Sequence, residues 1–374
     1  MLLARTGLQM VALILVLLAL ERFHEPAIAG AVTFLSIAPG LVVSPIAGAL
    51  LDRHGRTRLV IADYAIEAAA LGTIAVLAAT DRLSVPLLLV IVALASLTNP
   101  LSSTGIRTLF PVLVPPPLWE RANAIDSNGY VVASIFGPAA AGGLVATVGS
   151  AGALAVTAAL FGLAALVTIG LRDPGEGVSR GRLLGEAWAG VVYVARHPTL
   201  RALALAVSTS NIGWGLTFLA LPVFVLTRLG QGPDFVGSLF ALVGVAGSVS
   251  VLAFGRVSSS GREARYMGAS MLAMGAAFLA LAVAAHPVVV VLAMLAVGAA
   301  NGPYDVVLFT LRQRRTDPAW LGRAFAVSMA LNYAGFPLGS GLGGVVVAQS
   351  VGLAFGVAAA LEALAALITF RYVR

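Results

Sequence analysis

Residues 48–58 read GALLDRHGRTR and form a short charged segment between two apolar stretches. Residues 27–51 before it carry no charge, and residues 59–79 after it carry only Asp63 and Glu67. An apolar stretch of about 20 residues is long enough to cross a bilayer as an α-helix. The segment therefore predicts a tight turn at a membrane surface, with one membrane helix leading into it and another leading away.

The composition extends this prediction to the whole chain. Of its 374 residues, 59% are hydrophobic and 10% are charged, whereas a soluble domain carries about 25% charged residues. Long apolar stretches recur from one end to the other, which indicates an all-α protein that crosses the membrane many times. We predict twelve membrane helices, at residues 2–20, 27–51, 59–79, 84–110, 120–148, 150–171, 200–227, 234–256, 264–284, 287–312, 320–348 and 351–371.

The arginines predict the orientation of the chain. All of them except Arg22, Arg82 and Arg228 lie at the two termini or in loops that follow even-numbered helices. Since loops rich in arginine stay on the cytoplasmic side, we expect both termini in the cytoplasm and the chain in the cell membrane. The same rule accounts for the net charge of +7 without a nucleic-acid partner.

Several chemistries are excluded by the residues that the sequence lacks. There is no cysteine, which excludes thiolate metal sites and cysteine nucleophiles. The four histidines lie singly in or next to loops and form no metal cluster. No phosphate-binding loop of the Walker type is present. We therefore expect no cofactor, no metal site, no enzymatic activity and no direct use of ATP.

A polar stretch lies in the middle of the chain. Residues 172–199 are predicted to form a cytoplasmic linker. Within it, an apolar face is predicted for a helix that lies on the inner membrane surface, made of Leu184, Trp188, Val191 and Val192.

The linker separates two similar halves, residues 1–171 and 200–374, each with six predicted helices. They repeat each other at an offset of about 202 residues, since the segment RANA at residues 121–124 returns as RAFA at residues 323–326. Parallel repeats of this kind are typical of secondary transporters.

The charged segment resembles the signature loop of the major facilitator superfamily of transporters. The matching pattern is Gly48-x-x-x-Asp52-Arg53-x-Gly55-Arg56-x-Arg58. Two further segments, RANA at residues 121–124 and HPTLR at residues 197–201, resemble the drug and siderophore exporter branch of that family. The resemblance implies two pseudo-symmetric six-helix halves and a secondary active transporter that works by alternating access.

The resemblance also implies that the loop is a conformational latch, made of Gly48, Asp52, Arg53, Gly55, Arg56 and Arg58. In the family, the acid of this loop sits near the start of the eleventh helix, where the helix dipole favours negative charge. Carried over to Asp52, this contact would hold the cytoplasmic side closed. The alternative is that the charges of the loop only set the topology.

Proton coupling requires an acid inside the membrane, where ionisable groups are costly and mark functional sites. Asp63 and Glu67 lie four residues apart, hence on one helix face. Asp126 lies on a polar stripe of the fifth helix. We expect Glu67 and Asp126 to carry protons, although Glu67 in a buried pair and Asp126 as a gate are alternatives. Asp63 is a third candidate that we expect to pair with an arginine such as Arg56. Glu362 is discounted because the twelfth helix is usually peripheral in the family.

Polar and aromatic residues on several helices are candidate walls of a substrate cavity, because such cavities combine apolar surface with a few polar groups. They are Tyr130, Asn211, Trp214, Phe218, Asn301, Tyr304, Asp305 and Asn332. The alternative for each aromatic residue is helix packing or contact with lipid. The fifth helix also carries Gly137, Pro138 and Gly142, which resemble a motif of the antiporter branch and would equally allow close helix packing.

These observations together favour proton-coupled efflux of a small hydrophobic or amphipathic molecule. Its expected partners are that substrate, protons and the lipid bilayer, and the protein is expected to be a monomer. The alternatives are an importer or uniporter of a small metabolite, or a non-transporting membrane protein such as a lipid scramblase. The first helix begins almost at Met1, which predicts either a true start upstream of Met1 or a shortened first helix.

Overall fold

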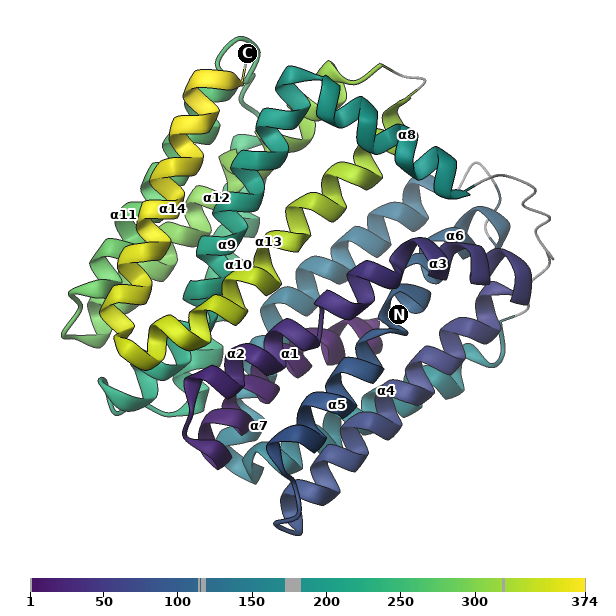
Figure 1. The fold of residues 1–374 in the computed structure, drawn as a ribbon, viewed down its shortest axis with the longest axis vertical. Helices are drawn as coiled ribbons and strands as arrows, with labels where there is room; N and C mark the ends of the chain where they lie inside the picture. The colour runs from purple at the N-terminus through teal and green to yellow at the C-terminus, as the bar shows by residue number, and fades with distance from the viewer. Residues whose placement is uncertain (1, 114, 116–118, 172–182, 318–319, 374) are drawn as a thin grey trace. The chain divides into compact units, whose positions relative to one another are not determined.

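The computed structural model describes residues 2–113, 115, 119–171, 183–317 and 320–373. Within these ranges the description leaves out the side chains of residues 45, 48–49, 52–54, 107–113, 119–128, 183–187 and 321–326. The described residues form helices and no strand (Figure 1). The helices are α1 (Leu2–Phe23), α2 (Pro26–Leu35), α3 (Ala38–His54), α4 (Arg56–Ala79), α5 (Val85–Ser96), α6 (Asn99–Leu113), α7 (Trp119–Thr168), α8 (Leu183–Arg196), α9 (Pro198–Thr227), α10 (Pro233–Phe254), α11 (Glu263–Ala282), α12 (Pro287–Arg315), α13 (Leu321–Gln349) and α14 (Val351–Tyr372).

These helices account for the twelve predicted membrane crossings. Among the described residues, ten helical stretches are long and apolar enough to span a membrane. One of them, Gly129–Thr168, has 40 residues, which is about 60 Å of helix and enough for two crossings of a hydrocarbon core of roughly 30 Å. α13 adds a further helix of 29 residues. The predicted all-helical membrane fold is thus confirmed.

The two crossings within α7 meet at Gly149. Its φ of 74° and ψ of 169° belong to a region that is open essentially to glycine alone. The helix is interrupted at this residue because its backbone is not helical. Glycine is required there because a side chain would be strained in that conformation. The break lies between the predicted fifth and sixth helices, residues 120–148 and 150–171.

The second and fourth predicted helices are each broken in the middle. α2 and α3 are separated by residues 36–37, and α5 and α6 by residues 97–98. The second residue of both α3 and α6 is a proline, which is tolerated at a helix start because the N–H there has no helical partner. Gly40 of α3 lies against the carbonyl oxygen of Ser96, so the two breaks pack against each other.

The chain forms two compact units. The first consists of Met1–His24 and Val32–Leu183, and the second of Glu25–Ala31 and Leu184–Arg374. The start of α2 therefore belongs to the second unit, where Gly344 of α13 packs against the backbone of α2.

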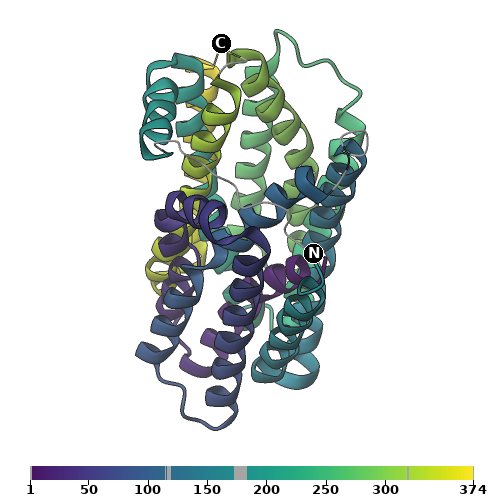
Figure 2. The ribbon, with the colours of Figure 1, turned by 90° about the vertical axis from the view of Figure 1, so that its right-hand side faces the viewer.

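In the first unit, α1 and α4 pack against α7, and α6 packs against α3 and α4. α4 and α5 form an antiparallel pair joined by a short loop (Figure 2). Arg22 at the end of α1 donates to the carbonyl of Leu83 at 3.2 Å and pairs with Asp81 at 2.9 Å. Because Asp81 is exposed, this pair adds little stability, but it fixes the end of α1 to that loop.

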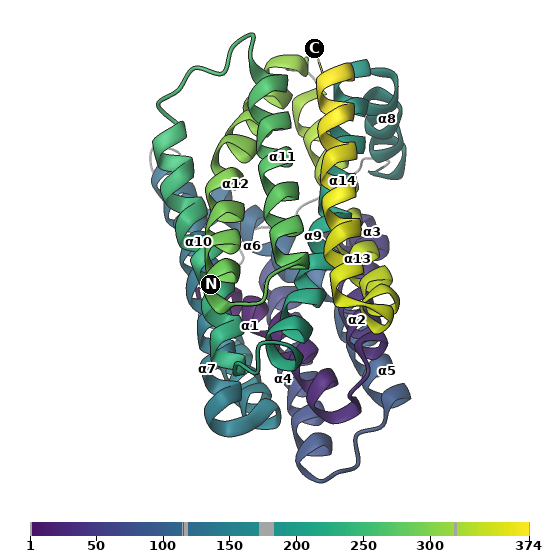
Figure 3. The same ribbon diagram turned by 90° about the vertical axis from the view of Figure 1, so that its left-hand side faces the viewer.

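In the second unit, α9 packs against α13 and α14, α10 packs against α12, and α11 packs against α12 and α14 (Figure 3). Glycines allow α9 and α13 to approach closely. Gly215 lies against the carbonyl oxygen of Phe336, and Gly339 lies against the carbonyl oxygen of Ile212. Small residues at helix contacts are typical of membrane proteins, in which close packing holds helices together.

The helix expected within the linker is α8. It leads into α9, whose N-cap is His197; the His197 ring accepts a hydrogen bond from the backbone N–H of Leu200 at 3.3 Å. Trp188 and Val191 of α8 are exposed, as the apolar face of a helix lying on a membrane surface would be.

Candidate functional site

The charged loop forms the junction between α3 and α4. α3 ends at His54, α4 begins at Arg56, and Gly55 between them has a φ of 86°, which favours glycine. Gly105 of α6 lies so close to this junction that an added Cβ would be 2.6 Å from Val60. The glycines at these two positions therefore have structural reasons: one allows the turn and the other allows α6 to pack against α4.

The six predicted latch residues are only partly described. Arg56 is half-buried and Arg58 is exposed. Asp52 and Arg53 belong to α3, and their side chains, like the environment of Gly48, lie outside the described residues. The latch contact of Asp52 stays a prediction.

Asp63 and Glu67 are both buried on α4, with exposed fractions of 1% and 5%. Neither carboxyl oxygen of Asp63 has a hydrogen-bond partner within the described part of the chain. Its polar neighbours are Thr98 and Ser102, but their hydroxyls donate to backbone carbonyls three residues earlier. The expected ion pair with Arg56 is therefore wrong for this structure. Arg56 is the first residue of α4, about 10 Å along the helix axis from Asp63.

Other ionisable and aromatic side chains surround these two acids. Glu67 interacts electrostatically with Asp63, and Tyr64 does so with Asp63, Arg5 and Tyr130. The guanidinium carbon of Arg5 lies 3.7 Å from the ring centre of Tyr130, a cation–π contact. We call these five residues, which come from α1, α4 and α7, the N-terminal acid cluster. Tyr130, predicted as a cavity residue, belongs to it.

The remaining residues predicted on α7 fall into two groups. The side chain of Asp126 lies outside the described residues, so its role as carrier or gate stays a prediction. Gly137 packs against α1, where an added Cβ would be 2.5 Å from the Cβ of Gln9. Pro138 follows within the helix, and Gly142 is buried. The contact at Gly137 is one that a larger residue would prevent.

An aromatic cluster surrounds the middle of α9. The centre of the Phe218 ring lies 5.0 Å from the centre of the Phe240 ring and 5.3 Å from the centre of the Phe336 ring. The ring of Trp214 is 6.3 Å from that of Phe240 and 6.5 Å from that of Phe278. Phe278 is fully buried, whereas Trp214 and Phe218 are half-buried. The two predicted cavity residues thus form the partly exposed edge of a packed cluster.

A buried arginine lies near the end of α12. The exposed fraction of Arg312 is 0%. With the Asn332 amide oriented to satisfy its neighbours, Arg312 Nη2 donates to the Asn332 oxygen at 2.8 Å, and the Asn332 nitrogen donates to the carbonyl of Ser328 at 2.9 Å. Arg312 Nη1 also lies 3.3 Å from the sulfur of Met329. Asn332, predicted as a cavity residue, is therefore a hydrogen-bond partner of a buried charge.

Glu362 of α14 is also buried, with an exposed fraction of 1%. The hydroxyl of Ser210 on α9 lies 2.8 and 3.0 Å from its two carboxyl oxygens. Tyr304 of α12 interacts electrostatically with Glu362 and Asp305. The expectation that an acid on the twelfth helix is peripheral is thus wrong for Glu362. The sequence did contain the signal, since an acid within an apolar membrane helix is a functional candidate by default.

The predicted cavity residues of the second unit lie at contacts between several different pairs of helices. An added Cβ at Gly335 would be 3.0 Å from the Cβ of Asn211, and one at Gly247 would be 3.8 Å from that of Asn301. Tyr304 is buried beside Ser210, and Asp305 is half-buried next to it.

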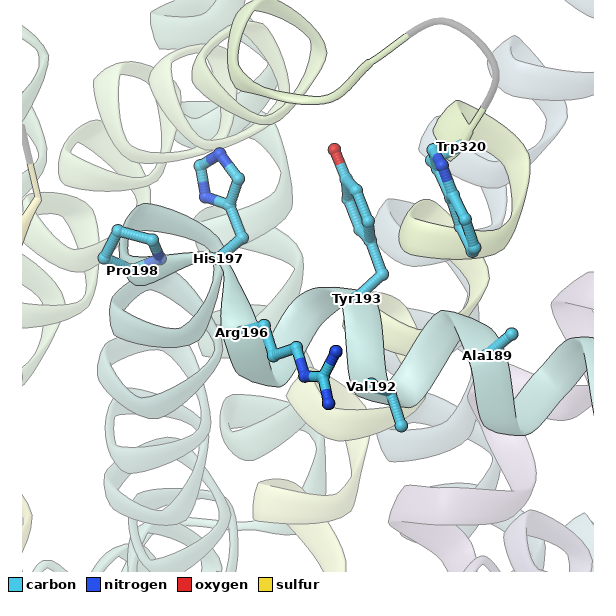
Figure 4. A pocket seen from close by; sticks show the side chains of 7 residues that line it. All are labelled: Ala189, Val192, Tyr193, Arg196, His197, Pro198 and Trp320. Atoms are coloured by element: carbon cyan, nitrogen blue, oxygen red, sulfur yellow. The ribbon is translucent and has the colours of Figure 1, made fainter.

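An open cavity of about 500 Å³ lies beside the linker helix (Figure 4). Its lining residues are Ala189, Val192, Tyr193, Arg196, His197, Pro198 and Trp320. None of the predicted site residues lines it. Tyr193 and His197 extend from the same side of the chain, with Trp320 beside Tyr193 (Figure 4). The cavity therefore marks the junction of α8 with the start of α13.

The fold and these clusters define a class of protein: a polytopic helical membrane protein with buried acids in both of its units. Its sequence matches the family model of the Major Facilitator Superfamily over residues 1–208 and again over residues 203–374. The chain belongs to the major facilitator superfamily, and it is a multi-pass membrane transporter.

Two curated relatives illustrate its place in that family. The chain is 41% identical to an uncharacterized MFS-type transporter, y4rN, of Sinorhizobium fredii over 370 residues, which cover 98% of this chain and 91% of the relative. It is 27% identical to the multidrug efflux pump Tap of Mycolicibacterium fortuitum, over 87% of this chain and 81% of the pump. The resemblance to the exporter branch thus extends to a named efflux pump.

Solved structures share the fold at lower identity. The nucleoside transporter NupG superposes with a TM-score of 0.75 at 17% identity, covering 99% of this chain and 98% of that one. The peptide transporter POT gives a TM-score of 0.78 at 15% identity, covering 98% and 91%. A bacterial homologue of the iron transporter ferroportin gives 0.76 at 18% identity, covering 99% and 96%. Identities this low support the fold alone.

Proposed function

We propose that this transporter exports a small hydrophobic or amphipathic molecule in exchange for protons, by alternating access. The observation that carries the proposal is the pair of buried acids on α4. Asp63 and Glu67 lie on one face of a membrane helix, and the carboxyl oxygens of Asp63 have no hydrogen-bond partner within the described residues. Acids in such places are costly to stability and are retained where they bind protons or cations.

Proton exchange at this pair follows from the cost of burying charge. Two neighbouring carboxylates in apolar surroundings repel each other, and an unpaired buried charge is strongly unfavourable. Binding a proton removes that cost, and access to the other side of the membrane allows the proton to leave. Arg5, the cation of the N-terminal acid cluster, acts electrostatically on Tyr64 beside Asp63.

An apolar substrate is supported by the aromatic edge at Trp214 and Phe218. Both rings are half-buried and rest on fully packed aromatic neighbours. Cavities that bind small molecules combine rigid apolar surface of this kind with a few polar groups. The similarity to the efflux pump Tap supports export as the direction.

The proposed transport cycle uses the loop between α3 and α4 as a latch. Gly55 separates the two helices, so the acid at the end of α3 can be presented to another helix start. We place both termini on the cytoplasmic face of the cell membrane, following the arginine distribution, and we propose that the monomer is sufficient for transport.

The proposal is tested in proteoliposomes that hold a pH-sensitive dye, with ethidium and a panel of other amphipathic dyes as probes. We expect dye movement coupled to opposite proton movement in the wild type. Asp63→Asn, Glu67→Gln and Asp126→Asn are the test variants. Asp81→Asn removes an exposed acid of the same unit and serves as the matched control, which should transport normally.

The outcomes separate the competing functions. Dye flux without proton flux would identify a uniporter, and proton-coupled uptake of small metabolites would identify an importer. Lipid movement between leaflets without dye flux would identify a scramblase. Full coupling in all three amide variants would show that the coupling acid lies elsewhere.

A further inference from the structure

Glu362 lies where three helices of the second unit meet. Its carboxyl group contacts the Ser210 hydroxyl on α9 at 2.8 and 3.0 Å. On the side of α11, an added Cβ at Gly275 would be 3.2 Å from the Cβ of Glu362. Glu362 therefore lies in the interior of the unit, where its exposed fraction is 1%, and does not face outward as an acid on a peripheral helix would.

The groups around Glu362 are neutral. Ser210 faces it from α9, Tyr304 interacts with it from α12, and α11 presents Gly275. Within the described residues, no ion pair with Glu362 is formed and no charged group of α11 or α13 acts on it. A carboxylate in such surroundings is far more costly than a neutral carboxylic acid, which can still form hydrogen bonds.

α12 contributes polar side chains to this region. Tyr304 is buried and interacts electrostatically with Glu362, Asp305 and Arg312. Asp305 is half-buried, whereas Glu362 and Ser210 are buried. Within the described residues, Ser210 is the side chain that a hydrogen bond joins to the Glu362 carboxyl group.

We propose that Glu362 is a proton-binding residue of the second unit, and that its proton is exchanged by way of the Ser210 hydroxyl. On release, the O–H bond of the acid breaks and its proton passes to the Ser210 oxygen, while the former hydroxyl proton of Ser210 passes to a water molecule. The Glu362 carboxylate then accepts a hydrogen bond from Ser210, and one proton has moved from Glu362 to water.

This inference rests on the proposed proton-coupled export and adds a second proton site to it, separate from the acids of α4. A purely structural role would be a hydrogen-bonded link between α9 and α14. A glutamine at position 362 would keep such a link, because its amide also hydrogen-bonds to a hydroxyl, but it cannot bind and release a proton. Glu362→Gln therefore distinguishes the two roles.

The direct test is infrared difference spectroscopy of the full protein in lipid bilayers, titrated from acid to alkaline buffer. We expect a carbonyl band of a protonated carboxylic acid that diminishes as the pH rises and that is lost in Glu362→Gln. Ser210→Ala removes the hydrogen-bond donor and should shift the frequency of that band. Glu263→Gln removes an acid that is paired with Arg314 at 2.9 Å and should leave the band unchanged.

A band that is unchanged in Glu362→Gln would overturn the assignment. A band that is present at every pH, together with normal proton-coupled flux in Glu362→Gln, would show a permanently neutral link and overturn proton exchange. If Glu362→Gln fails to fold, the frequency shift in Ser210→Ala decides the assignment. A titrating Glu362 band in a wild-type protein that exports no dye would instead contradict the proposed export, so the two failures are distinguishable.

Discussion

The ring of Tyr193 in α8 lies parallel to the ring of Trp320 at the start of α13, with centroids 4.9 Å apart and an interplanar angle of 5°. The backbone N–H of Asp317 donates to the Tyr193 hydroxyl at 3.1 Å. One tyrosine therefore joins the linker helix to the connection between α12 and α13 by two separate interactions. α8 is therefore held by contacts within the second unit, to which the chain belongs from Leu184 onward.

These two interactions can be removed one at a time. Tyr193→Phe keeps the stacked ring and loses the hydrogen bond, which contributes about 0.5–1.5 kcal/mol. Tyr193→Ala also loses the stack, a further contribution of about 0.5–1.5 kcal/mol. We expect hydrogen exchange in α8 to accelerate in that order, measured by mass spectrometry of the purified protein. Equal exchange in the wild type and in Tyr193→Ala would show that α8 is held by other contacts.

The conformation at Gly149 predicts an asymmetry between two neighbouring glycines of α7. Gly149→Ala should destabilise the protein by about 1–3 kcal/mol, because a side chain is strained at a φ of 74° and ψ of 169°. Gly143 is the matched control, since an added Cβ there meets nothing within 4 Å. Gly143→Ala should be neutral or stabilise by up to about 1 kcal/mol, because alanine favours the helix. The midpoint of thermal unfolding in detergent measures both, and equal midpoints would contradict the role of Gly149.

Most helix positions could be predicted from the sequence because they depend on local properties. The length of an apolar stretch and the position of a proline fix α10 at Pro233–Phe254, against a predicted 234–256. The breaks at residues 36–37 and 97–98 could not be predicted, because they depend on the packing of Gly40 against Ser96. Such a contact between distant segments leaves no pattern in either one.

The candidate site was predictable to the same extent. The burial of Asp63 and Glu67 followed from their place within an apolar helix. Glu362 was discounted because the twelfth helix is usually peripheral in the family, although an acid within an apolar helix is itself a signal. Its contact with Ser210, 152 residues away in the sequence, could not be predicted. Asn332 was identified as polar and inward-facing, but its hydrogen bond to Arg312 depends on the register between α12 and α13, which a single sequence does not reveal.

The contact between Arg312 and Asn332 predicts that replacing one of the two residues destabilises the protein more than replacing the other. Asn332→Leu leaves a buried guanidinium without its 2.8 Å acceptor, and leaving a buried hydrogen-bonding group unsatisfied costs about 1–3 kcal/mol, and more when the group is charged. Arg312→Met removes the charge and keeps an apolar chain of similar length, so it should cost less. Thermal unfolding of both single variants and the double variant gives the coupling energy. A larger loss in Arg312→Met would show that the charge itself stabilises the fold.

The proposed latch predicts that Asp52→Asn keeps the protein in the membrane and lowers transport on the order of tenfold, equivalent to about 1.4 kcal/mol. The amide cannot supply the negative charge that a helix start favours. Dye efflux from cells, normalised to the amount of protein in the membrane, measures the effect. If the loop sets only the topology, membrane insertion should depend more on the exposed Arg58 than on Asp52, because positive charge determines orientation. Arg58→Gln would then reduce insertion, and Asp52→Asn would transport normally.

The aromatic edge predicts that two phenylalanines of α9 respond differently to the same change. Phe218 is half-buried and lies 5.0 Å from Phe240, whereas Phe224 is buried and lies 5.7 Å from Phe355. Leucine at either position removes an aromatic contact worth about 0.5–1.5 kcal/mol. Phe218→Leu should in addition change the relative efflux of planar and non-planar dyes, because a half-buried ring at the proposed cavity wall would also contact the substrate. Phe224→Leu should lower stability and leave that ratio unchanged.

The ratio of efflux rates for two dyes, measured in the same vesicles, is independent of the amount of folded protein. An equal ratio in both variants would identify the cluster around Phe218 as packing alone.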